Sequence, residues 1–164
     1  MHKEKLQDKI ERLEKELEQA KEELKRTSER FVPKINEKYY FLKNDYEIGE
    51  DRFCAGSSID RTRYENYNCF ETKEEAQREA SKILIRRKLE AIAKRLNNGE
   101  EIDWNNYNQI KYHITYNFEK ACLNYVINYK CKDAGCVYCI NSNFISEAIK
   151  EINEQELIDY IKGE

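Results

Sequence analysis

The chain has 164 residues, of which 37% are charged and 40% hydrophobic, and its net charge is −3. A charge this close to neutral gives no general attraction to nucleic acid or to an anionic membrane. No apolar run approaches the roughly 20 residues that span a bilayer, and the first residues lack the apolar segment of a signal peptide. A cytoplasmic protein with free cysteines is therefore expected.

The first thirty residues predict a helix that pairs with a second copy of the chain. Apolar residues recur at alternating spacings of four and three, which is the heptad pattern of a coiled coil. In a parallel pair, Lys9 faces Glu14 and Glu16 faces Lys21, so both facing pairs have opposite charges. Residues 1–30 are thus expected to form a parallel coiled coil that makes the chain a homodimer. The alternative is a single amphipathic helix packed on its own domain. The heptad positions are Leu6, Ile10, Leu13, Leu17, Ala20 and Leu24.

Residues 31–164 are expected to form an α+β domain, because Pro33 ends the first helix and the hydrophobic pattern then changes. Short aromatic and β-branched runs predict strands, with a hairpin turn at Asn44-Asp45. Thr72 is then expected to cap a long helix that ends near Asn97. The three strands are expected at residues 38–42, 46–53 and 64–70.

The second half has the same predicted order. Apolar and polar residues alternate strictly from Ile110 to Phe118, which is the clearest strand pattern in the chain. Two more strands are expected at 122–130 and 135–141, followed by a helix capped by Ser142. A short helix near residues 154–161 is expected to close the chain.

The halves 37–98 and 107–152 therefore both predict strand, strand, strand, helix, with the C-terminal helix added. This order predicts an antiparallel sheet covered by helices and suggests duplication of a βββα unit. The alternative is that every junction between a strand and a helix needs a capping residue. The similarity of the junctions at Thr72 and Ser142 would then be no evidence of duplication.

Two segments resemble patterns found in small phage and prophage accessory proteins of low-GC Gram-positive bacteria. Residues 31–41 resemble aromatic-x-Pro-Lys-x-Gly-Glu-x-Tyr-Tyr, and residues 68–76 resemble Asn-x-Phe-x-Thr-x-Glu-Glu-Ala. Asn36 and Tyr67 stand where those proteins have glycine. The resemblance implies a phage accessory protein in the host cytoplasm, and such proteins often block host defences.

The cysteines suggest zinc by their spacing but not by their predicted structure. Cys131, Cys136 and Cys139, with Cys122 as a fourth ligand, would suit a zinc site. Cys136 and Cys139 fall in a predicted strand, however, where residues three apart point to opposite faces. No metal is therefore expected, and buried free thiols are the default interpretation.

No motif indicates catalysis. A cysteine nucleophile needs a basic partner, and His113 is the only histidine within the predicted domain. Cys54, Cys69 and Cys122 are candidates to pair with it, but nothing local marks any of them. The sequence also lacks a phosphate-binding glycine loop, so neither an enzyme nor a cofactor is expected.

Cations and aromatic rings before and on the long helix predict a surface for a ligand or partner, because cations neutralise phosphate and rings stack on bases. The alternative is the solvent face of an amphipathic helix. A protein inhibitor of a host defence protein, such as a CRISPR nuclease, is favoured; a sponge for a nucleotide signal and a nucleic-acid-binding protein are the alternatives. The predicted binding residues are Arg61, Arg63, Tyr64, Tyr67, Arg86, Arg87 and Trp104.

Overall fold

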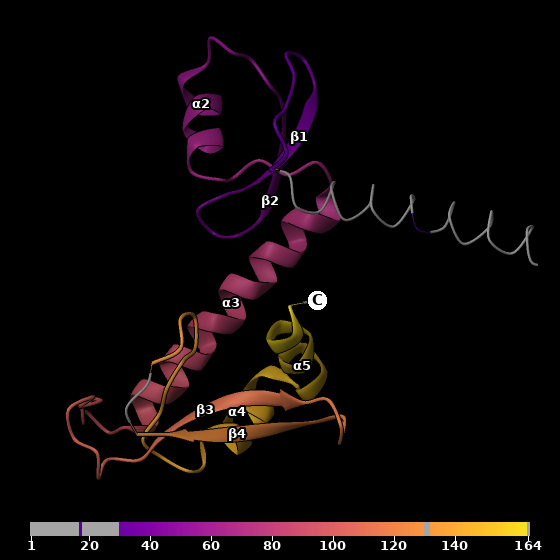
Figure 1. Cartoon of the computed structure of the whole chain (residues 1–164). Coiled ribbons are helices and arrows are strands. Elements are labelled where there is room, and N and C mark those ends of the chain that lie inside the picture. The colour runs from indigo at the N-terminus through magenta and orange to yellow at the C-terminus, as the bar shows by residue number, and fades with distance from the viewer. Residues whose placement is uncertain (1–16, 18–29, 130–131, 164) are drawn as a thin grey trace, which may run out of the picture. The chain divides into compact units, whose positions relative to one another are not determined.

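The computed structural model describes residue 17 and residues 30–129 and 132–163 (Figure 1). Five predicted heptad residues, Leu6, Ile10, Leu13, Ala20 and Leu24, lie outside these residues. The sixth, Leu17, is exposed. The coiled coil therefore stays a prediction.

The chain divides into two compact units, Met1–Phe41 with Gly49–Thr72, and Leu42–Ile48 with Lys73–Glu164. Each combines a two-stranded antiparallel sheet with helix, which confirms the α+β class. None of the described helices has the length and apolar character that a membrane span requires.

The first sheet is a hairpin of β1 (Lys38–Leu42) and β2 (Ile48–Arg52). The predicted turn at Asn44-Asp45 is confirmed, since the Tyr46 N–H donates to the Lys43 carbonyl at 3.0 Å across it. The third predicted strand, 64–70, is wrong. Helix α2 (Ser58–Glu65) occupies its start, and only Phe70 bridges β1, at Tyr40.

Two local features explain why residues 64–70 are not extended. The Ser57 side chain accepts a hydrogen bond from the Asp60 N–H and caps α2, which then includes Tyr64. Tyr67 has a φ of 60°, a left-handed conformation that cannot continue a strand. The cap at Ser57 therefore determines the local structure more strongly than the spacing of the aromatic residues, which had predicted a strand.

Helix α3 (Lys73–Leu96) confirms the long helix predicted between Thr72 and Asn97. Its buried side chains are spaced at helical intervals, as expected. Ile85 and Leu89 are buried, whereas the neighbouring Leu84 is exposed.

The second sheet pairs β3 (Lys111–Asn117) with β4 (Cys122–Asn128), so the strict alternation from 110 to 118 predicted a real strand. Residues 135–141 do not form the third strand. Only Cys139 bridges β3, at Tyr112, and a turn precedes it. Gly135 has a φ of 84°, which interrupts extended backbone.

The C-terminal segment forms α4 (Phe144–Ile152) and α5 (Glu154–Lys162). Asn143, rather than Ser142, is the residue before α4. Asn153 ends α4 with a φ of 83°, and its side chain accepts from the Gln155 N–H to cap α5.

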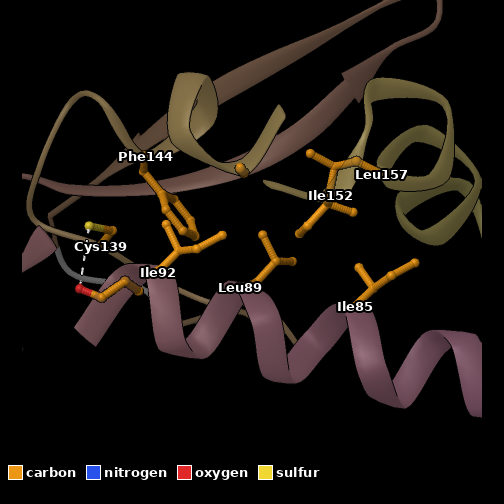
Figure 2. Packing of buried hydrophobic residues seen from close by; sticks show 9 residues of the cluster. Ile85, Leu89, Ile92, Cys139, Phe144, Ile152 and Leu157 are labelled. Carbon is orange, nitrogen blue, oxygen red and sulfur yellow. Dashed lines mark hydrogen bonds between the residues drawn. The ribbon is translucent and has the colours of Figure 1, made fainter. Parts of the chain in front are cut away.

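The core of the second unit lies between α3, α4 and α5. Figure 2 shows Ile85, Leu89 and Ile92 of α3 directed toward residues of the C-terminal segment. Full burial of one such side chain stabilises a fold by about 1.5–3 kcal/mol. The cluster is Ile85, Leu89, Ile92, Ala93, Cys139, Phe144, Ala148, Ile152 and Leu157.

Both halves have a hairpin whose first strand is bridged by a residue close before a helix, Phe70 before α3 and Cys139 before α4. The first half also contains α2, which has no counterpart between Asn128 and Cys139 among the described residues. Duplication of a βββα unit therefore stays a hypothesis.

Candidate functional site

Arg63, a predicted ligand-binding cation, is part of a polar network inside the first unit. Its guanidinium donates to the Tyr39 hydroxyl at 2.7 Å and to Asp51 at 3.1 Å, and lies 3.4 Å from the centre of the Phe41 ring. Asp60, only 4% exposed, accepts from the Tyr39 hydroxyl at 2.6 Å. Arg63 is thus a structural residue that joins α2 to the hairpin.

This network shifts the pKa values of two of its members. Burial, together with the hydrogen bond to Asp60, raises the pKa of Tyr39 to about 12. Burial alone would raise the pKa of Asp60, but hydrogen bonds from Tyr39 and the Cys54 N–H and the charge of Arg63 lower it overall. The folded state therefore favours the neutral phenol of Tyr39 and the ionised carboxylate of Asp60.

Tyr64 and Tyr67 share a cation that belongs to the chain itself. The Arg30 guanidinium lies 3.8 Å from the centre of the Tyr64 ring and 3.9 Å from that of Tyr67, within cation–π range of both. These rings are therefore not free platforms for a ligand. Arg61 is exposed on α2.

In the second unit, Arg86 and Trp104 line one open cavity of about 910 Å³. Lys94 and Lys132 add two further cations, and Tyr138 packs edge-on against Trp104 with ring centres 4.9 Å apart. Three carboxylates, Glu90, Glu100 and Glu101, also line the cavity. Its charges are therefore balanced, and Arg86 donates to Glu90 at 3.0 Å.

Arg87, the remaining predicted cation, does not line this cavity. Its guanidinium lies 4.8 Å from the centre of the Tyr46 ring within the second unit. The predicted binding residues thus separate: the structure brings Arg86 and Trp104 to one cavity, but Arg61, Arg63, Tyr64 and Tyr67 belong to the first unit.

A fully buried lysine supports the Trp104 loop. Lys111, at 0% exposure, donates from Nζ to the Asn106 carbonyl at 2.8 Å. Its ammonium also lies 5.6 Å from the centre of the Trp104 ring. Alternation along β3 places Lys111 on the face opposite Tyr112, and the loop covers that face.

The same face of β3 carries His113, whose ring is 5.1 Å from that of Tyr138. Cys136 is the cysteine near this histidine: potential metal-ligating atoms of His113, Asp133 and Cys136 all lie within 4.8 Å of one another. The predicted partners were different, because Cys54 and Cys69 belong to the first unit and Cys122 pairs with Asn117 at the other end of the hairpin.

This pair does not have the protonation states of an activated nucleophile. Burial, with the nearby Asp133 charge, raises the pKa of the Cys136 thiol. Burial lowers the pKa of His113, although Asp133 opposes this. Both shifts disfavour the thiolate and the imidazolium of an activated cysteine–histidine pair. The described cysteines are free thiols: Cys54, Cys69, Cys122, Cys136 and Cys139.

Among the described residues, strand β4 lies at an edge of its sheet. Tyr112 exchanges hydrogen bonds with Cys139, at 2.7 and 2.9 Å, so its N–H and C=O point away from β4. In an antiparallel ladder such a residue and its partner, here Ile127, form a non-hydrogen-bonded pair. By alternation, the backbone groups of Leu123, Tyr125 and Ile127 point away from β3, and the Tyr125 N–H donates to the Asn124 side-chain oxygen at 2.9 Å. Within the described residues, β4 has no other strand neighbour.

The sequence could not reveal several of these features. Asp133 and Asn128 carried no motif, and their proximity to His113 depends on the β3–β4 pairing and the turn at Gly135. The sequence of β4, CLNYVIN, visibly lacks charged residues. This is unusual for a strand at a sheet edge, which charged residues commonly protect. No protein-family model, curated protein or solved structure matches this chain.

Proposed function

We propose that this protein is a non-catalytic binding protein that acts by protein–protein interaction. The setting suggested by the resemblance is a phage-encoded inhibitor of a bacterial defence system, such as a CRISPR nuclease, acting in the host cytoplasm. The observation that carries the binding proposal is the edge of β4, which is uncharged and has no strand neighbour beyond β3 among the described residues.

Natural sheets usually protect a free edge with charged residues, proline or a covering segment. β4 contains neither a charged residue nor proline. Tyr125, Val126 and Ile127 remain 46%, 40% and 40% exposed. An edge of this kind favours the addition of a strand from another protein, since backbone groups supply hydrogen bonds and alternate side chains supply contacts.

The proposed occupant is an extended segment of the target protein, paired with the outward groups of Leu123 and Ile127 and, once the Asn124 side chain turns away, of Tyr125. Phe118, which is 76% exposed in the adjoining turn, extends the apolar surface. Such an interaction needs no catalytic group and no cofactor. This proposal also agrees with the pKa shifts of Cys136 and His113, which disfavour an activated cysteine–histidine pair.

Plating of a defence-sensitive phage tests the proposal. The full chain, expressed in hosts that each carry one active defence system, should raise plating at least about tenfold in one of them. Ile127→Pro removes an outward N–H, which proline tolerates at a strand edge, and should abolish this effect. Glu119→Lys in the hairpin turn is the control and should keep it. No rise in plating with any system, or full activity of Ile127→Pro, would contradict the proposal.

A specific observation favours a second function, the binding of a nucleotide-type signal. The cavity lined by both Arg86 and Trp104 also contains Lys94, Lys132 and the ring of Tyr138. Cations can bind a phosphate group, and aromatic rings can stack on a nucleotide base. The nearby carboxylates are less favourable to the long polyanion of a nucleic acid. Trp104 is the only tryptophan, so its fluorescence reports directly on this cavity.

Cyclic and ADP-ribose-type nucleotides should then quench Trp104 and raise the unfolding temperature. Loss of a charge-assisted contact costs about 1.5–3 kcal/mol, so Lys94→Ala should weaken binding about tenfold or more. Arg61→Ala, which changes an exposed cation of the first unit, is the control. Quenching that Lys94→Ala leaves unchanged would refute binding in this cavity.

A further inference from the structure

A tight turn brings two metal-ligating side chains of the second unit together. The Cys136 N–H donates to the Asp133 carbonyl at 3.3 Å, and Gly135 has the positive φ of 84° that a type II turn requires at its third residue. Asp133 and Cys136 therefore begin and end the same turn. The strand expected at 135–141, which would have separated its side chains onto opposite faces, is absent.

We propose that His113, Asp133 and Cys136 bind one transition-metal ion of the zinc type. The ligand atoms would be the imidazole Nε2, a carboxylate oxygen and the thiolate sulfur. His113 comes from β3, and the other two come from the turn. Their candidate ligand atoms lie within 4.8 Å of one another, and Nε2 is 3.9 Å from Asp133 Oδ2.

These separations are somewhat longer than those of an occupied zinc site. Zinc bonds of about 2.0–2.3 Å in tetrahedral geometry place ligand atoms roughly 3.4–3.6 Å apart. The His113 and Asp133 ligand atoms must therefore approach by about half an ångström, and the Cys136 sulfur by up to about 1 Å. The side chain of Asp133 is 59% exposed, so it has room for this adjustment.

Neighbouring groups contact the ligand side chains. The Asn128 amide lies 3.2 Å from His113 Nδ1, on the ring nitrogen that the metal would leave free, and it also lies 3.4 Å from Asp133 Oδ2. A metal-bound histidine normally donates this N–H to an acceptor, and rotation of the amide presents its Oδ1. The Tyr138 hydroxyl donates to Asp133 Oδ2 at 3.2 Å and accepts from the Asp133 N–H at 2.8 Å.

The ligand types determine the class of metal. Thiolate and imidazole favour zinc and similar ions over magnesium or calcium, which prefer oxygen ligands. On binding, the Cys136 thiol gives up its proton to solvent and its sulfur takes a place in the coordination sphere. Water can occupy the fourth position. The ion would link the turn to β3.

The test uses the full chain, stripped of metal and titrated with zinc, and with cobalt as a spectroscopic probe. One ion should bind per chain, and cobalt should give a thiolate-to-metal charge-transfer band. Cys136→Ser should abolish this band, and Cys136→Ser, His113→Gln and Asp133→Asn should each weaken zinc binding at least about tenfold. Cys54→Ser, an exposed cysteine of the first unit, should bind as the wild type does.

Circular dichroism of the metal-free variants separates lost ligation from lost folding. A folded Cys136→Ser protein that no longer binds zinc supports the site. Wild-type protein that takes up no zinc in tenfold excess overturns it. So does a Cys136→Ser or His113→Gln protein that keeps wild-type affinity.

Discussion

Arg61 and Arg63 are two residues apart on α2 and have opposite roles. Arg63 contacts the Tyr39 hydroxyl and compensates the buried Asp60 carboxylate, while Arg61 is exposed. Cations that serve the fold and cations that face solvent are indistinguishable by residue type. Their partners, not their spacing, decide which is which.

Substitution separates these roles. Arg63→Ala leaves Asp60 charged, buried and without its cation, so it should destabilise the first unit by about 2–4 kcal/mol. Arg61→Ala should change stability by less than about 0.5 kcal/mol. Urea unfolding of both variants measures the difference. Equal midpoints for the two variants would show that Arg63 is not a structural residue.

The raised pKa of Tyr39 predicts a loss of stability at high pH. The neutral phenol is favoured in the folded state, so this stabilisation is fully present below the unfolded pKa of about 10. It is lost as pH rises through the folded value of about 12. The shift corresponds to about 2–3 kcal/mol.

Chemical denaturation of wild type and Tyr39→Phe at pH 9 to 12 checks this prediction. Other groups titrate in both proteins, so the difference between the two curves isolates Tyr39. The wild type should lose more stability than the variant over this range. Parallel curves would contradict the shift.

At the scale of elements, the alternation of hydrogen bonds along β4 predicts different effects of proline at adjacent positions. Ile127 points its N–H away from β3, whereas Val126 forms a hydrogen-bonded pair with His113. Val126→Pro should therefore cost about 3 kcal/mol or more, and Ile127→Pro about 1 kcal/mol. Thermal unfolding measures both. Similar losses would mean that the edge assignment is incorrect.

Elements with strong hydrophobic periodicity were predictable from the sequence. β3 followed from strict alternation and α3 from helical spacing. α2 was not predictable in this way, because its only buried residue is the polar Asp60. The strand expected at 135–141 failed because a glycine with positive φ outweighed the β-branched and aromatic residues around it.

The candidate sites were predictable only in part, for a related reason. Arg86 and Trp104 do line one cavity. The partners of Tyr64 and Arg63, however, are Arg30 and Tyr39, which lie more than twenty residues away in sequence. Only the fold reveals that these groups are already in use.

At the scale of the whole molecule, the N-terminal heptads predict self-association. Light scattering of the full chain should give about twice its mass of 19.8 kDa at micromolar concentration. Leu13→Asp places a charge at a core position of the predicted coiled coil and should give a monomer. Glu11→Lys, outside the heptad core, is the control. A monomeric wild-type protein would refute the coiled-coil prediction.

The two units also contain separate chemical reporters of their own opening. Cys69 lies in the first unit and Cys139 in the second, and burial raises the pKa of both thiols. A thiol reagent can modify such a group only when the surrounding structure opens. Labelling rates at the two cysteines therefore measure how often each unit opens. With Cys54, Cys122, Cys131 and Cys136 replaced by serine, equal rates would indicate one cooperative opening, and unequal rates two independent ones.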